Sequence, residues 1–211
     1  MSDASEPRRL RQDAVRNRAD VLAAAERVFA RRGLEATVED IAAEAGVGVG
    51  TVYRRFGSKS ELIQTLYRER LDQVLELIDH CAALPTGRQA LHAVMRAFVD
   101  LQTLSRAQQQ LLFSTEAPDA GVLRTEVEPR LTAIIERAKA EGAVRADFAA
   151  TDVPVLTHAV TDAATRLPDG GRELAVRHLE LLLKGLAPGE DEVPIPPPLP
   201  DERFAQWLQP V

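Results

Sequence analysis

The sequence has little of several features that other protein classes need. A single cysteine, Cys81, among 211 residues allows no internal disulfide and no cysteine-rich zinc site, which fits a reducing cytoplasm. The longest apolar run is the five residues from Val21 to Ala25, whereas a membrane-spanning helix needs about 20. Residues 1–7 carry no charged-then-apolar leader. We therefore expect a soluble, cytoplasmic protein without a membrane segment or a bound metal.

An excess of positive charge is also lacking. The chain holds 26 Lys and Arg against 32 Asp and Glu, for a net charge of −6, which taken alone disfavours binding to nucleic acid. The basic residues are concentrated at one end, because residues 1–70 hold 13 Lys and Arg against 11 Asp and Glu. Residues 8–32 alone hold eight arginines and three acidic residues. This segment predicts either contact with a polyanion or, as for most charge runs, a solvated helix face.

Apolar residues recur at helical spacing over most of the chain, and no segment reads as a convincing strand, so the predicted fold class is all-α. Gly33 and Gly46 are placed to end helices, and Thr37 with Asp40 forms the start signal of a capping box. The expected helices cover about residues 15–32, 38–45, 49–56, 59–84, 87–104, 106–115, 120–141, 152–166 and 171–186.

Residues 38–56 have the organisation of a helix-turn-helix, in which the second helix lies in the DNA major groove with its N-terminal residues at base edges. The outer face of that helix carries Val49, Thr51, Arg54 and Arg55. Gly48 and Gly50 are unusual there, since glycine costs up to about 1 kcal/mol relative to alanine inside a helix. They either let a phosphate approach the helix N-terminus or close a tight turn between the helices.

Residues 19–66 resemble the N-terminal DNA-binding domain of the TetR/AcrR family of bacterial transcriptional regulators. The spacing agrees without a gap. The residues that carry the resemblance are Ala24, Ala25, Phe29, Gly33, Thr37, Ile41, Ala42, Ala45, Gly46, Val47, Gly50, Thr51, Val52, Tyr53, Phe56 and Lys59. Many relatives carry a capping serine at the position of Gly48, where glycine keeps the cap only slightly less well.

The resemblance implies a DNA-binding site. Its predicted residues are Thr37, Gly48, Val49, Gly50, Thr51, Tyr53, Arg54, Arg55 and Lys59. Thr37, Tyr53 and Lys59 match positions that contact phosphates in the family, although capping explains Thr37 equally well. Tyr53 should point outward, because Val52 and Phe56 already supply the inward face. Arg54 and Arg55 are candidates for base or phosphate contacts, since an arginine fork can pair with O6 and N7 of guanine.

The resemblance further implies a homodimer, formed through the helices at about 152–166 and 171–186, that binds a palindromic operator in double-stranded DNA. A small-molecule effector would bind between Pro85 and Leu167 and release the DNA, and repression is the usual mode of the family. The apolar residues of 171–186 would otherwise complete the core of a monomer. The expected parts are a basic flexible arm (1–14), the helix-turn-helix domain (15–58), a ligand-binding and dimerisation domain (59–187) and a proline-rich tail (188–211).

Two other classes of function fit the sequence less well. The four histidines show no HExxH spacing, there is no GxSxG motif, and no glycine-rich phosphate loop follows a strand, so we expect neither an enzyme nor a cofactor. A helical scaffold that uses the helix-turn-helix for protein contact is the remaining alternative. It leaves the basic N-terminal segment and the pair Arg54–Arg55 unexplained.

Overall fold

The computed structural model of the protein describes residues 6–103, 123–164, 167, 171–189, 195–200, 203–204 and 207, with side chains for all of these except 6–17, 103 and 123–124. Every regular element in these ranges is a helix, which confirms the all-α fold class, and no strand occurs among them. The helix expected at 106–115 lies outside the described residues.

The described residues form two units, of which the first ends at Glu69 and the second begins at Arg70. This division lies inside the long helix α4 (Lys59–Ala82), whereas the expected boundary lay at its start. The reason is packing: Leu62, Ile63 and Leu66 of α4 belong to the hydrophobic core of the first unit.

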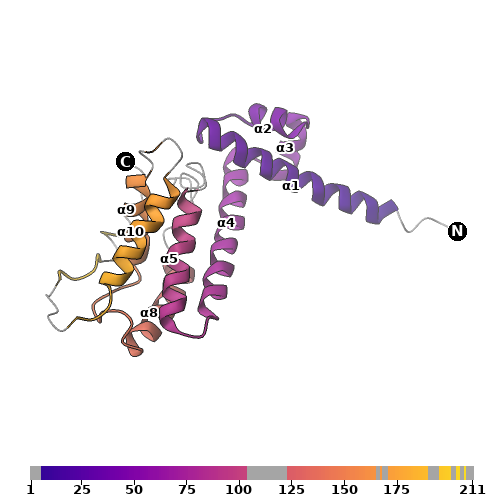
Figure 1. Ribbon diagram of the computed structural model, residues 1–211. Coiled ribbons are helices and arrows are strands. Elements are labelled where there is room, and N and C mark those ends of the chain that lie inside the picture. The colour runs from indigo at the N-terminus through magenta and orange to yellow at the C-terminus, as the bar shows by residue number, and fades with distance from the viewer. Residues whose placement is uncertain are drawn as a thin grey trace. The chain divides into compact units, whose positions relative to one another are not determined.

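The first unit consists of α1 (Glu6–Arg32), α2 (Val38–Ala45), α3 (Val49–Phe56) and the beginning of α4 (Figure 1). The apolar stripe predicted for α1 is buried, with Val21 and Phe29 at its two ends, and α1 packs against α2. Val52 of α3 enters the same core. Burial of these stripes, worth about 1.5–3 kcal/mol for each large apolar side chain, sets the orientation of α3.

The first helix begins earlier than expected. It starts at Glu6, so residues 6–14 are helical where the sequence predicted a flexible arm. Between Glu6 and Val15 there is no glycine, and the one proline, Pro7, lies in the first turn, where its missing N–H interrupts no hydrogen bond of the helix. This stretch therefore contains no helix breaker, and it extends α1 although it lacks an apolar stripe.

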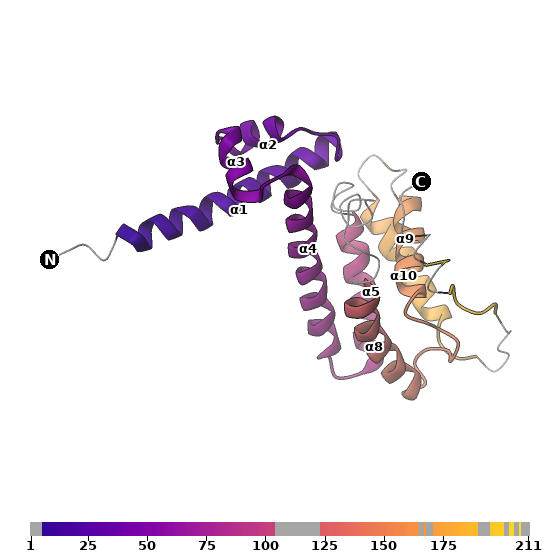
Figure 2. The ribbon, with the colours of Figure 1, turned by 180° about the vertical axis from the view of Figure 1, so that it is seen from behind.

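The second unit contains the rest of α4 and the helices that follow. They are α5 (Gly87–Thr103), the π-helical turn η1 (Leu123–Val127), α8 (Glu128–Ala140), α9 (Asp152–Ala164) and α10 (Arg172–Gly185). Within this unit α5 packs against α8, α9 and α10, and α9 packs against α10 (Figures 1 and 2). The segment expected as one helix at 120–141 is helical over 123–140, and it changes from a π-helical turn to an α-helix where Pro129, which has no N–H to donate, enters the first turn of α8.

The connection between α4 and α5 is held by α8. Arg137 donates from Nη1 to the carbonyl of Ala82 (3.0 Å) and from Nη2 to that of Leu84 (3.2 Å), which satisfies acceptors at the end of α4. The Glu141 carboxylate accepts from the backbone N–H of Gly87 (2.7 Å) at the start of α5. Two side chains from one end of α8 therefore cap both helices that meet at this turn.

The described part of the proline-rich tail returns to α9. Residues 195–200 adopt neither helix nor strand. Farther on, the rings of Phe204 and Trp207 stack with centroids 5.8 Å apart, and Trp207 meets the ring of His158 edge-on at 5.5 Å. Through this ring contact Trp207 docks on α9 of the helical body.

Candidate nucleic-acid interface

The candidate interface is built on the turn between α2 and α3. Gly46 ends α2 in the left-handed conformation, with φ of 67°, which costs about 1–2 kcal/mol for a residue that has a Cβ. The chain then extends through Gly48, the N-cap of α3, and the buried side chains of Val52 and Phe56 anchor the inner face of α3. The turn and these two anchors together determine which face of α3 is exposed.

Two large side chains stand on the outer face of α3. Tyr53 is 46% exposed, which confirms that it points outward, and Arg54 is exposed as well. The Arg54 side chain lies along the helix: Nε donates to the carbonyl of Gly50 (3.1 Å) and Nη2 donates to Oγ1 of Thr51 (3.2 Å). The guanidinium is therefore held near the N-terminal turn of α3.

The predicted site residues all lie in the first unit, on or beside the ends of three helices. Thr37 is the N-cap of α2, Lys59 begins α4, and the others occupy α3 and its N-cap. The exposed ones are Thr37, Gly48, Gly50, Tyr53 and Arg54, and the partly buried ones are Val49, Thr51, Arg55 and Lys59. Their contacts with DNA remain predictions.

Thr37 already has a structural role in the free protein. Its hydroxyl accepts from the backbone N–H of Asp40 (3.2 Å), and the Asp40 carboxylate accepts from the N–H of Thr37 (3.1 Å), so the predicted capping box is confirmed. The hydrogen bond from the Thr37 backbone, followed by one from Arg32, lowers the pKa of the Asp40 carboxyl. The cap fixes the start of α2 with an ionised carboxylate.

No internal contact accounts for the glycines at the start of α3. Gly48 has φ of −72°, and the only φ values above zero among the described residues belong to other glycines. A Cβ placed on Gly50 would meet no atom within 4 Å, and one on Gly48 would only touch Thr51 Oγ1 at 4.0 Å. The tight turn is made by Gly46 instead. The glycines therefore leave open space on the outside of the helix N-terminus.

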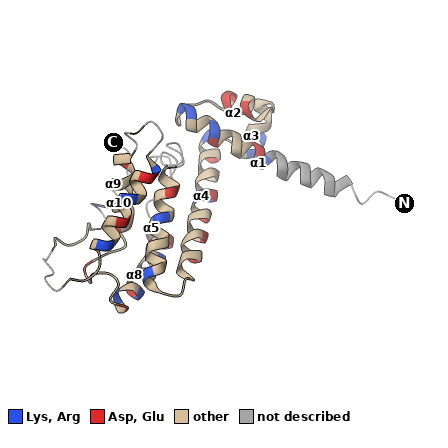
Figure 3. Cartoon of the chain, viewed as in Figure 1, with Lys and Arg blue, Asp and Glu red and all other residues tan. Residues whose placement is uncertain are grey.

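Three arginines of the basic segment are paired inside the unit, a feature that the sequence reasoning missed. Arg27 donates to Glu44 at 2.8 Å, Arg31 pairs with the other oxygen of Glu44, and Arg32 pairs with Asp40. Figure 3 marks the Lys and Arg residues of the described part of α1 in blue and the Asp and Glu residues of α2 in red. The hydrogen bond from Arg27, then that from Arg31, lowers the pKa of Glu44. These ion pairs hold α1 against α2. The count of eight arginines in residues 8–32 therefore overstates how much positive charge is available to a polyanion. The only hint of this pairing in the sequence is that Asp40 and Glu44 are four residues apart and so lie on one face of α2.

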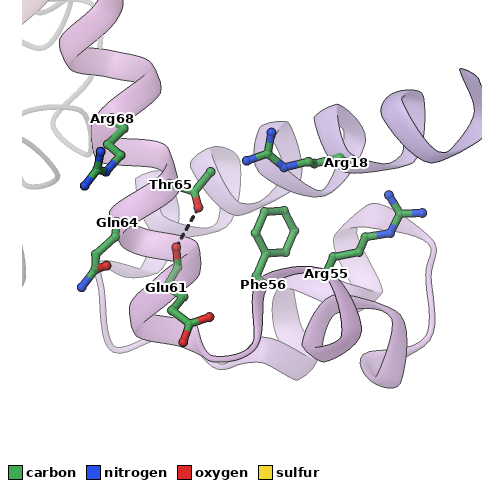
Figure 4. Close-up of a pocket in the computed structure, with 7 residues that line it drawn as sticks. All are labelled: Arg18, Arg55, Phe56, Glu61, Gln64, Thr65 and Arg68. Atoms are coloured by element: carbon green, nitrogen blue, oxygen red, sulfur yellow. Dashed lines mark hydrogen bonds between the residues drawn. The ribbon is translucent and has the colours of Figure 1, made fainter. Parts of the chain in front are cut away.

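A surface hollow of about 260 Å³ lies between α1, α3 and α4 (Figure 4). Its lining residues are Arg18, Arg55, Phe56, Glu61, Gln64, Thr65 and Arg68. The Arg18 guanidinium carbon lies 5.8 Å from the centre of the Phe56 ring, and Nη1 lies 3.9 Å from Oε1 of Glu69. Arg18, one of the eight arginines of the basic segment, thus has partners within the unit. The hollow is lined by residues of both signs of charge.

The described residues offer no other kind of site near this surface. No group of three or more His, Cys, Asp or Glu among them is arranged to hold a metal ion. None of the described helices combines the length and the apolar character that crossing a membrane requires.

Comparison with known proteins identifies the family. Residues 21–66 match the description "Bacterial regulatory proteins, tetR family", and residues 86–188 match "Transcriptional regulator SbtR-like, C-terminal domain". The crystal structure of the TetR transcriptional regulator SCO0520 from Streptomyces coelicolor is 34% identical in sequence, with a TM-score of 0.59, over 81% of this chain and 98% of that chain. The chain belongs to the TetR family of bacterial regulatory proteins. The helix-turn-helix of this TetR-family chain is therefore the DNA-binding motif of its family.

Other relatives of this TetR-family chain match it less completely. The transcriptional regulator TtgR from Pseudomonas putida is 43% identical over 76 residues, and the match spans about a third of each chain, 36% of this one and 34% of TtgR. FadR from Bacillus subtilis, solved in complex with stearoyl-CoA, is 18% identical with a TM-score of 0.60 over 79% of this chain and 98% of that one. At that identity the likeness shows the fold alone. These relatives are transcriptional regulators, which is a non-enzymatic function.

Proposed function

We propose that this TetR-family chain is a regulator that binds a palindromic operator as a homodimer and is released by a small-molecule effector. The observation that carries the proposal is the outer face of α3. It exposes Tyr53 and Arg54, and it begins with two glycines, at 48 and 50, that no contact in the described protein requires. A helix of this kind suits the major groove, where its first turn meets base edges and bare backbone allows close approach.

The remaining site residues would grip the DNA backbone on either side of α3. Thr37 and Lys59 begin the two helices that flank it in sequence, and backbone N–H groups at a helix N-terminus attract phosphate. The Tyr53 hydroxyl would donate to a phosphate oxygen. Val49, Thr51 and Arg55 complete the surface that faces the groove. Phosphate contacts would fix the position of the protein, and the base contacts would supply its specificity.

Support for a homodimer comes from α9 and α10. Leu181 on α10 is 55% exposed, and Leu174, Val176 and Leu182 on the same helix are only partly buried, although Leu179 is fully buried in the unit. An apolar surface of this kind is typical of a helix that packs against a second copy. A two-fold dimer would place its two α3 helices about 34–36 Å apart, or a larger multiple of the DNA repeat, and so requires a palindromic operator.

Effector binding belongs to the second unit in this proposal. The fold that the chain shares with FadR holds stearoyl-CoA in that protein. Release needs only a difference in effector affinity between the DNA-bound and free conformations, typically about 1–3 kcal/mol. In the same proposal residues 1–14 precede the DNA-reading part (15–58), residues 59–187 serve dimerisation and the effector, and 188–211 form the tail. Repression is the proposed mode of regulation, because a dimer bound to an operator within a promoter blocks access of the transcription machinery to that promoter. The proposed compartment is the cytoplasm, where bacterial DNA lies.

Selection from a random pool of DNA duplexes tests the proposal. The purified full-length protein should enrich a palindrome whose half-sites are about one helical turn or more apart. Binding to the enriched duplex should weaken with salt, with a slope of log affinity against log salt near −0.9 per phosphate contacted. A helical scaffold would enrich no motif, and that result would overturn the proposed function.

A further inference from the structure

The Arg54 side chain is directed by its own helix. It leaves α3 in the second half of the helix, but its guanidinium contacts Gly50 and Thr51, one turn closer to the N-terminus. Side chains on a helix lean toward the N-terminus in general, and here two hydrogen bonds hold that direction. The guanidinium therefore reaches the turn of α3 that would meet base edges in a helix-turn-helix.

The two hydrogen bonds engage the donors on one edge of the Arg54 guanidinium. Nε–H and the neighbouring hydrogen of Nη2 form the side edge, and they donate to the Gly50 carbonyl at 3.1 Å and to Thr51 Oγ1 at 3.2 Å. Arginine has five N–H donors in a fixed planar arrangement. The outer edge, with one hydrogen each on Nη1 and Nη2, is the fork that remains for a ligand. Such a fork matches two acceptors side by side.

Among the base edges of the major groove, guanine presents two adjacent acceptors, O6 and N7, whereas adenine presents an acceptor beside a donor. A phosphate also offers two acceptor oxygens, but the guanidinium lies at the base-reading turn of α3. We propose that Arg54 reads one guanine in each half-site through its outer edge, and that Thr51 is the positioning residue that holds the guanidinium. This inference rests on the proposed function, since it assumes that α3 enters the major groove.

Of the two acceptors that hold the Arg54 guanidinium, the one on Thr51 can be tested by substitution. The Gly50 acceptor is a backbone carbonyl that substitution does not remove, whereas the Thr51 acceptor is a hydroxyl. Thr51→Val removes the acceptor with little change of shape, and Thr51→Ser keeps it. If Thr51 acts only through Arg54, its substitution has no effect once Arg54 is alanine, because residues that act through one interaction are not additive. A direct contact from Thr51 to DNA would keep its effect in that background.

The first experiment repeats the duplex selection with variants. The wild type should enrich a guanine at one position of each half-site, and Arg54→Ala should lose that preference while the rest of the motif persists. Arg88→Ala on α5 is the charge-matched control, and it should enrich the wild-type motif. The second experiment replaces each guanine of the enriched duplex by 7-deazaguanine, which lacks the N7 acceptor. Replacement at one position of the half-site should weaken wild-type binding by up to about 5- to 150-fold for each half-site replaced, and it should leave Arg54→Ala unaffected.

The outcomes separate the two claims. Equal weakening of Arg54→Ala on enriched and unrelated duplexes would show a phosphate contact, and it would overturn the guanine assignment while the proposed function stands. Loss of affinity with Thr51→Val in the Arg54→Ala background would overturn the positioning role, as would equal losses for Thr51→Ser and Thr51→Val in the wild-type background. Failure of the wild type to enrich any motif would overturn the proposed function and the inference together.

Discussion

Gly50→Ala separates what α3 needs for folding from what it needs for DNA. In the free protein the substitution should be favourable. The added Cβ would meet no atom within 4 Å, and Gly50 is not among the glycines with positive φ. Alanine also restricts the unfolded chain, so a compatible Gly→Ala change stabilises a protein by about 0.4–1 kcal/mol. For a chain of this size that corresponds to a rise in Tm of about 1–4 °C.

The same methyl group should weaken DNA binding. If the backbone at Gly50 lies against the DNA, the Cβ enters that contact, and an added methyl group in a closely packed site costs about 1–3 kcal/mol. The affinity for the selected duplex should therefore fall by about 5- to 150-fold for each half-site. The Arg54 hydrogen bond to the Gly50 carbonyl is retained in the variant, so the loss is separate from the role of Arg54.

Thermal unfolding and fluorescence anisotropy with labelled duplex measure the two effects on the same preparation. Gly46→Ala is the matched control: Gly46 also has open space around it, but its φ of 67° makes alanine destabilising by about 1–2 kcal/mol. A Gly50→Ala protein that is more stable and binds DNA as tightly as the wild type would refute the close approach. A Gly50→Ala protein that is less stable than the wild type would contradict the open space that the structure shows around Gly50.

Three further substitutions test other parts of the structure. Tyr53→Phe should weaken binding by about 1.5–3 kcal/mol for each half-site, equally on selected and unrelated duplexes, because each protomer loses one hydrogen bond to a charged phosphate. A loss on the selected duplex alone would contradict this. Leu181→Asp should give a folded monomer in sedimentation velocity, because Leu181 is 55% exposed within one chain, and a persistent dimer would place the interface elsewhere. The pKa of Glu141 is lowered, first by the N–H of Gly87, so its stabilising effect exists above about pH 4.5 and is lost as pH falls through the lower native value. Glu141→Gln should therefore be less stable than wild type in urea at pH 7, with a difference that shrinks toward pH 3, and a difference independent of pH would contradict the assignment.

Local signals in the sequence predicted the helix-turn-helix well. The capping box of Thr37 and Asp40 and the left-handed Gly46 act within a few residues, so their geometry follows from the residue types themselves. The orientation of α3 was predictable for a similar reason, because Val52 and Phe56 are four residues apart and form one inward face. Outward exposure of Tyr53 follows from the same helical period.

Contacts between distant segments were not predictable from spacing. The pairs of Arg27 and Arg31 with Glu44 join two helices whose packing the sequence does not specify, and the charge count treated these arginines as available. Arg137 reaches carbonyls at the end of α4, more than 50 residues earlier in the chain. The orientation of Arg54 falls between these cases, because its acceptors are three and four residues away but the choice of edge depends on the rotamer.

Footprinting is the most direct measurement of whether α3 reads an operator as part of a dimer. The purified protein, freed of bound small molecules, would be tested across the DNA upstream of its own gene and neighbouring genes at increasing salt. We predict protection of a palindrome that fades as salt rises, with both half-sites lost together when Leu181→Asp replaces the wild type. Absence of protection at low salt, or protection of a single asymmetric site by the wild type, would contradict the proposal.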